Sequence, residues 1–212
     1  MIKAVNFWNG MAEKYAKHPI ADEKAYQQTL DRTRSYLSST DSILEVGCGT
    51  GSTALLLAGD VAQITASDLS ENMIGIGGKK ATDQDISNVK FVAADLFDIT
   101  LDDDPYDAAL ALNVVHLLED IPAAIARINN LLKPDGIFIS KTVCQPESGM
   151  PFKFRIMKLV LPLMQLIGKA PYVNFLKTNE LERIIMSGGF EILESGSYPA
   201  SSMSRYVVAR KI

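Results

Sequence analysis

Three glycines stand at alternate positions in the segment EVGCGTG (45–51), directly after an apolar run that predicts a buried strand. Because glycine has no side chain, Gly47, Gly49 and Gly51 let the backbone turn tightly and leave its amides and the next helix N-terminus open to a ligand. The following predicted strand ends in Asp68, whose carboxylate would accept hydrogen bonds from both hydroxyls of a ribose. The pattern predicts a nucleoside site at the carboxyl edge of a parallel sheet; the alternative is a glycine cluster that only connects a strand to a helix.

Two nucleoside cofactors fit this description, nicotinamide dinucleotide (NAD) and S-adenosylmethionine (SAM). The dinucleotide fingerprint GxGxxG requires glycine where the chain has Ser52, and the pattern found is GxGxG preceded by Glu45. The chain also lacks the second mononucleotide-binding half that a dinucleotide fold supplies. SAM is therefore the favoured cofactor, with S-adenosylhomocysteine (SAH) as its product.

Few side chains outside this loop have the chemistry of a catalyst. His116 lies three residues after Asn113, at the cofactor end of the predicted fourth strand, and is the candidate general base; the alternative is that it packs and caps the next helix. His18 has the position of an exposed helix-end residue. Cys48 and Cys144 lack the spacing of metal ligands or of a disulfide framework, so we expect buried reduced thiols and no metal site.

Apolar periodicity alternates along the chain between the helical and the strand pattern. Helices are predicted over 4–17, 22–38, 70–81 and 121–132 and from near residue 52, and strands over 42–46, 62–68, 89–95, 106–113 and 136–143. This alternation predicts an α/β fold with a parallel sheet and helices on both faces. After residue 150 we expect an apolar helical stretch, a helix capped by Thr178, and an antiparallel pair of strands over 190–198 and 204–212.

The length favours one domain over residues 1–212. Its expected parts are helices that cover the site (1–40), a cofactor-binding core (41–145), a helical insertion (150–177), and a closing helix and strand pair (178–212).

Composition excludes several classes of protein. The net charge is −4 and 47% of the residues are hydrophobic, so the chain has neither the charge of a nucleic-acid binder nor the composition of a disordered tail. The N-terminal residues lack the pattern of a signal peptide, and no stretch reaches about eighteen uncharged apolar residues. We therefore expect a cytoplasmic protein without stable membrane insertion that acts on a small molecule, as a monomer or homodimer.

Five segments occur in order: ILEVGCGTG, SDLSENMI, VAADLFDI, YDAALALNVVHLL and LLKPDGIFIS. Together they resemble successive motifs of the class I SAM-dependent methyltransferases, in the small-molecule branch that includes the ubiquinone and menaquinone biosynthesis type. The resemblance covers residues 42–143. It implies a Rossmann-like seven-stranded sheet of order 3-2-1-4-5-7-6 whose seventh strand is antiparallel.

The resemblance also assigns cofactor-binding residues. The glycine loop would hold the methionine part, Asp68 the ribose, and Asp95 the adenine amino group, while Asn113 would pass beneath the sulfur. The remaining members of this set are Glu45 and Cys48 in the loop, and Leu69, Met73 and Leu96 around the adenine. One departure is visible: glycines at 75, 77 and 78 predict a short or frayed helix after Asp68.

The N-terminal segment NFWNGMAEKYAKHP resembles the FDxxAxxYD segment of the same branch, which folds over the cofactor. Tyr15 would then approach the methionine end or the acceptor, as a second candidate catalytic residue. The competing interpretation is a core stripe at helical spacing formed by Phe7, Trp8, Met11 and Tyr15.

The apolar segment 152–176 follows the predicted fifth strand, and Pro162 is expected to split it into two helices. Three roles stay open: completing the core or a dimer contact, a lid over an apolar acceptor, or peripheral membrane contact through 152–168. As a lid it would wall the acceptor pocket with residues such as Met157 and Met164.

These features favour a methyltransferase that acts on O, N or C of a small, apolar or aromatic acceptor. A protein or nucleic-acid methyltransferase is disfavoured because the fourth strand is followed by NVVH and no Pro-Cys nucleophile pair occurs. The alternative from another class is a catalytically silent SAM-binding regulatory or scaffold module.

Overall fold

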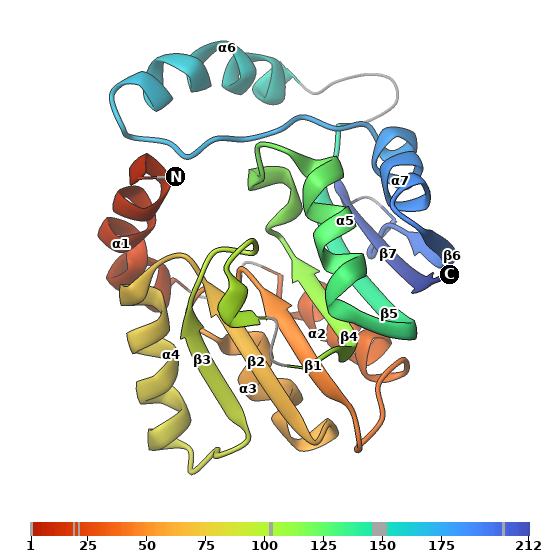
Figure 1. Ribbon diagram of the computed structural model, residues 1–212. Helices are drawn as coiled ribbons and strands as arrows, with labels where there is room; N and C mark the ends of the chain where they lie inside the picture. The colour runs from red at the N-terminus through yellow and green to blue at the C-terminus, as the bar shows by residue number, and fades with distance from the viewer. Residues whose placement is uncertain (1, 19, 21, 102–103, 146–151, 201) are drawn as a thin grey trace.

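The computed structural model describes residues 2–18, 20, 22–101, 104–145, 152–200 and 202–212 (Figure 1). Its centre is a seven-stranded sheet of order β3-β2-β1-β4-β5-β7-β6, in which β7 is antiparallel to both β5 and β6. The expected strand order and the expected antiparallel strand are confirmed. The strands are β1 (Ser42–Val46), β2 (Gln63–Asp68), β3 (Val89–Ala93), β4 (Tyr106–Leu112), β5 (Leu132–Val143), β6 (Phe190–Gly196) and β7 (Ser204–Lys211).

Side-chain caps fix where several helices begin. Asp22, Ser70 and Asp120 each accept a hydrogen bond from a backbone N–H in the first turn of α2, α4 and α5. The α-helices are α1 (Ile2–Lys17), α2 (Glu23–Arg34), α3 (Ser52–Leu57), α4 (Glu71–Asp83), α5 (Ile121–Leu131), α6 (Phe152–Leu166) and α7 (Thr178–Ser187), and a short 3-10 turn, η3 (Val115–Leu117), follows β4.

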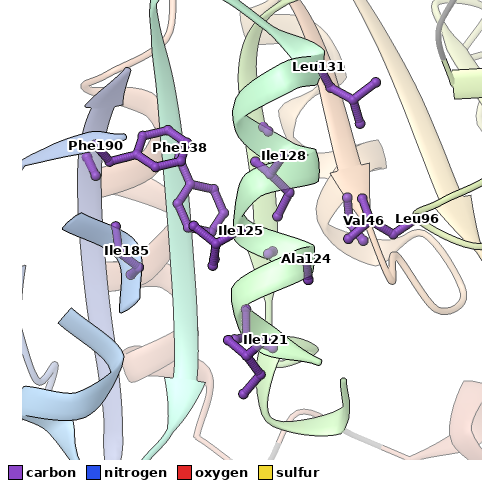
Figure 2. Packing of buried hydrophobic residues seen from close by; sticks show 14 of the residues in the cluster. Val46, Leu96, Ile121, Ala124, Ile125, Ile128, Leu131, Phe138, Ile185 and Phe190 are labelled. Carbon is purple, nitrogen blue, oxygen red and sulfur yellow. The ribbon is translucent and has the colours of Figure 1, made fainter. Parts of the chain in front are cut away.

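The sheet is buried on both faces because successive strand residues point to opposite sides. On one face Ile43, Ile64, Leu110 and Ile139 pack with α2 and α3. On the other face α5 and α7 cover the sheet, and Figure 2 shows Ile125 of α5 beside Phe138 of β5. The ring of Phe138 lies 5.5 Å from that of Phe190, measured between centroids.

The five parallel strands β1 to β5 end at the same edge of the sheet, because adjacent strands pair in parallel register. The loops that follow β1, β2, β3 and β4 therefore meet at this edge, as expected for a site there. Helix α6 lies beyond this edge as the outermost layer of the molecule, on the side of α1 (Figure 1).

The prediction of a short or frayed helix after Asp68 is wrong: α4 runs without interruption through Gly75, Gly77 and Gly78. The reason is tertiary packing. A Cβ atom built on either Gly51 or Gly77 would lie 2.4 Å from the ring of Phe91, so both glycines make room for this ring between the loop and the helix. Packing against β3 outweighs the low helix propensity of glycine.

Two boundary predictions are also wrong. Helix α6 is a single helix through Pro162, which removes one backbone donor, toward the carbonyl of Lys158, without ending the helix. The N-cap of α7 is Lys177, and Thr178 is the first helical residue. Residues 150 and 151 of the predicted insertion lie outside the described residues.

Candidate functional site

The glycine loop is held to the end of β2 by the carboxylate of Asp68. Its Oδ2 accepts a hydrogen bond from the Gly49 N–H at 3.0 Å, and its Oδ1 accepts one from the Ser70 N–H at 2.9 Å. Gly49 has a φ of 55°, a left-handed conformation that glycine adopts without strain. Burial raises the pKa of Asp68, and the two backbone donors oppose that shift. The chain thus presents a fixed carboxylate beside a side-chain-free loop.

A cavity of about 150 Å³, here called the Asp68 cavity, opens between this loop and the ends of β2, β3 and β4. Of the residues predicted to bind the cofactor, it is lined by Gly47, Gly49, Asp68, Leu69, Met73, Asp95, Leu96 and Asn113, and Tyr15 also lines it. Gly51 is absent from this lining because it packs against Phe91. The Asp95 carboxylate accepts a hydrogen bond from the Phe97 N–H at 3.0 Å.

A second cavity, here called the Lys141 cavity, adjoins the first, because Tyr15, Gly47, Leu112 and Asn113 line both. It measures about 330 Å³ and is lined by Glu45 and Cys48 of the predicted set. Its wall also includes Lys141 from β5, a residue that the sequence analysis did not select.

An acid and a base face this second cavity from different strands. Glu45 is 3% exposed, its Oε2 has no hydrogen-bond partner among the described residues, and burial raises its pKa to about 8. The Lys141 Nζ donates to Thr29 Oγ1 at 2.8 Å, and burial lowers the pKa of Lys141. Within the described part of the chain neither side chain forms an ion pair. The wall of this cavity therefore carries one carboxyl group and one amino group, neither with a charged partner among the described residues.

Tyr15 covers the glycine loop. A Cβ atom at Gly49 would lie 3.6 Å from the Tyr15 ring, so the absence of a side chain there lets the ring approach the loop closely. Burial, with smaller contributions from Asp68 and Glu45, raises the pKa of Tyr15. The phenol therefore stays protonated at neutral pH.

The two histidines lie in different surroundings. His116 lines none of the three cavities described here; its Nδ1 is buried without a described hydrogen-bond partner, and burial lowers its pKa. Its carbonyl accepts a hydrogen bond from the Asn174 N–H at 2.6 Å, which ties η3 to the segment after α6. His18 is exposed, as predicted, at the rim of the Lys141 cavity.

A third cavity of about 640 Å³, here called the α6 cavity, lies between α1 and α6 and shares Ala4, Glu119, Pro171 and Tyr172 with the Asp68 cavity. Helix α6 contributes Pro162, Gln165 and Leu166 to its wall. Met157 and Met164, predicted to line an acceptor pocket, are not in this wall and are exposed. The prediction that these methionines line the pocket is therefore wrong, because it assumed that the apolar face of the helix points inward.

Several lining residues were missed by the sequence analysis. Lys141 carried a readable signal, since it is a charged residue within a predicted buried strand. Phe97 and Tyr172 lie in irregular segments, where periodicity gives no indication of direction.

Two kinds of feature are absent from the part of the chain that the structure describes. It holds no group of three or more His, Cys, Asp or Glu side chains arranged to bind a metal ion. None of its helices combines the length and the apolar character needed to cross a bilayer. Cys48 and Cys144 are buried and not in a disulfide.

Comparison with known proteins adds the family. Residues 43–136 match the sequence profile of a family described as a methyltransferase domain. The chain is 25% identical over 170 residues to demethylmenaquinone methyltransferase of Staphylococcus carnosus, covering 73% of this chain and 70% of that protein. It is 27% identical over 162 residues to the protein of the same name from Staphylococcus aureus strain JH9, covering 69% of this chain and 66% of that protein.

Solved structures share the fold. Magnesium protoporphyrin IX methyltransferase from Synechocystis PCC 6803, solved with bound SAH, has a TM-score of 0.71 and 20% identity, with 98% of each chain covered. The [4+2]-cyclase SpnF has a TM-score of 0.69 and 22% identity, covering 87% of this chain and 80% of that one. The solved structures show the fold, and the matched profile and the glycine loop after β1 support a methyltransferase domain of the class I, SAM-dependent type.

Proposed function

We propose that the protein is a cytoplasmic methyltransferase that binds SAM and transfers its methyl group to O, N or C of a small, apolar or aromatic acceptor, releasing SAH. The observation that carries this proposal is the pair of adjoining cavities at the carboxyl edge of the sheet, one beside Asp68 and one between Glu45 and Lys141. The two similar staphylococcal proteins are named as methyltransferases, which supports methyl transfer as the class of reaction.

The residues present fit the cofactor at both of its ends. In the Asp68 cavity a fixed carboxylate faces the place of a ribose, and Leu69, Met73 and Leu96 give an apolar surface for a base. The methionyl end of SAM carries an α-ammonium and an α-carboxylate. We assign the ammonium to the carboxyl of Glu45, whose Oε2 has no partner among the described residues, and the carboxylate to the ammonium of Lys141.

When bound, SAM supplies a methyl group on a positively charged sulfur, already activated for transfer. The protein then has to align the acceptor and exclude water. Tyr15 covers the loop from α1, and Asn113, in a left-handed conformation with φ of 63°, turns the chain at the end of β4 between the two cavities.

The α6 cavity is the proposed acceptor site. It is continuous with the Asp68 cavity through shared wall residues, and most of its wall is apolar, including Phe7, Pro162, Leu166 and Tyr172. Such a wall favours an apolar or aromatic acceptor over a charged one.

Tyr15 and His116, the two candidates for a general base, differ in protonation state and in position relative to the cavities. Tyr15 lines both cofactor cavities but is held protonated by its raised pKa, whereas His116 is neutral but lines none of the three cavities described above. The geometry favours Tyr15 as a covering and positioning residue. A His116→Ala enzyme that keeps its SAM affinity and loses turnover would instead assign the base role to His116.

Calorimetry with SAM, SAH and NAD tests the cofactor, and transfer of a labelled methyl group to a panel of quinols, catechols, phenols and amines tests the reaction. We expect SAM and SAH to bind, NAD to bind far more weakly, and at least one aromatic acceptor to be labelled. Tighter binding of NAD would refute the proposal. Binding of SAM with no turnover on any acceptor would favour a silent SAM-binding module.

A further inference from the structure

Helix α6 turns its polar side toward the protein. The Lys158 Nζ donates to Gln145 Oε1 at 2.9 Å and lies 4.7 Å from the centroid of the Phe175 ring. The Gln165 side-chain amide donates to the Pro171 carbonyl at 2.9 Å. These two side chains, seven residues apart, lie on one stripe of the helix, and that stripe contacts the segment 171–176.

The opposite side of α6 is apolar and faces solvent. This outer face consists of Phe152, Ile156, Leu159, Val160 and Leu163, continued by Ile167. At 100° per residue these positions fall within roughly a third of the helix circumference. Leu159 is 83% exposed and Phe152 75% exposed, close to the most exposed apolar side chains elsewhere in the described chain. A contiguous apolar face of this kind marks an interaction surface.

Charge indicates what covers the outer face. The segment 152–176 contains Lys153, Arg155, Lys158 and Lys169 and no acidic residue, although the whole chain has a net charge of −4. Arg155 and Lys169 are exposed, and Arg155 borders the outer face on the helix. Two copies of this surface would bring like charges together, whereas a bilayer with anionic headgroups offers the opposite charge and an apolar interior.

We propose that α6 docks the protein on the surface of an anionic lipid bilayer, with the outer face at the boundary between headgroups and acyl chains. The helix has 15 residues, about 22 Å at 1.5 Å per residue, and suits a position in the plane of the interface. Arg155 and Lys169 then contact anionic headgroups.

The placement also has a consequence for the acceptor, which rests on the proposed function. The α6 cavity lies on the protein side of the same helix and continues into the Asp68 cavity. A docked α6 therefore brings the acceptor cavity to the bilayer surface, where an apolar acceptor would be concentrated.

Co-sedimentation of the full chain with vesicles tests the docking without cofactor or acceptor, so its outcome is independent of catalysis. The vesicles contain phosphatidylcholine alone or with about a third phosphatidylglycerol. We expect binding to the anionic vesicles, at least tenfold weaker in the double variant Leu159→Glu/Leu163→Glu. The matched control is Ile99→Glu/Ile212→Glu, which places the same two charges at 79% exposed positions far from α6 in the sequence and is expected to bind like wild type. Arg155→Gln/Lys169→Gln should weaken binding by about fivefold per charge removed.

Two further measurements keep the test decisive. Circular dichroism and SAM affinity of the double variant, both expected to match wild type, separate lost docking from lost folding. Sedimentation velocity without lipid tests the other occupant, a second copy of this chain. A wild-type dimer that Leu159→Glu/Leu163→Glu dissociates, with no vesicle binding, would overturn the proposal, as would equal binding of wild type and the double variant.

Discussion

Replacing Lys141 by methionine should weaken the binding of SAM, because it removes the ammonium that is proposed to bind the SAM carboxylate. The variant keeps the length and apolar stem of the side chain and deletes the ammonium, which donates to Thr29 Oγ1. Thr29 still donates to the Ala25 carbonyl at 2.9 Å, so α2 keeps its own contact. We therefore expect little change in folding.

The expected loss follows from the contact. A charge-assisted hydrogen bond between an ammonium and a carboxylate contributes about 1.5–3 kcal/mol. Lys141 is only partly buried, so water screens the interaction and the lower part of this range applies, about 1.5–2 kcal/mol. At about 1.4 kcal/mol per factor of ten, the dissociation constant of SAM should rise roughly 10- to 30-fold.

Calorimetry with two ligands isolates this effect. The second ligand is 5′-methylthioadenosine, which has the nucleoside and sulfur of SAM but no amino-acid end, and Lys141→Met should leave its affinity unchanged. The control variant is Lys79→Met, an exposed lysine of α4, with no effect on either ligand. Equal weakening of both ligands would refute the assignment, and unchanged SAM affinity with reduced turnover would place Lys141 at the acceptor instead.

Three other predictions concern the same region. Burial raises the pKa of Glu45 to about 8, so between pH of about 4.5 and 8 the folded protein holds a proton that the unfolded chain has released. The free energy of unfolding should therefore fall as the pH rises through this window, by up to about 1.4 kcal/mol per pH unit. Denaturant titrations should show a flatter slope for Glu45→Gln. Asp68→Ala should weaken the binding of SAM at least tenfold in calorimetry, since it removes the proposed acceptor for the ribose hydroxyls and the carboxylate that accepts from the Gly49 N–H. Unchanged SAM affinity would refute that role. On α4, Gly77→Ala should destabilise the fold by about 1–3 kcal/mol because its Cβ meets Phe91, whereas Gly75→Ala, with open space around its Cβ, should stabilise it by about 0.5–1 kcal/mol in thermal melts.

The cofactor half of the fold was predictable from sequence because local signals and global topology agree there. Each buried strand is a short apolar run, and the glycine loop and Asp68 mark the carboxyl ends of β1 and β2. The wrong predictions lie where a long-range contact decides. Periodicity alone does not indicate that the Phe91 ring fills the space left by Gly51 and Gly77, nor that β5 begins at Leu132 by pairing with Tyr106.

The direction of α6 is a different kind of failure. The apolar face of an amphipathic helix is expected to point inward, and that assumption led to the prediction for Met157 and Met164. The hydrogen bonds of Lys158 and Gln165 instead turn the polar side of α6 toward the protein and its apolar face outward. Amphipathicity can be computed from sequence, but which side meets the protein depends on partners such as Gln145 and Pro171 that lie outside the helix.

The two halves of the cofactor site are prepared for a ligand in different ways. Asp68 is already bound by two backbone N–H groups, so its carboxylate needs no rearrangement to accept a ribose. Glu45 is buried with an unpartnered oxygen, and its raised pKa records that the folded state disfavours its charge. An ammonium placed beside Glu45 favours the ionised carboxyl, so binding releases a proton, and SAM affinity should rise with pH up to about 8 and then level off. An ammonium bound in the Lys141 cavity would therefore offset part of the cost of burying the Glu45 carboxylate.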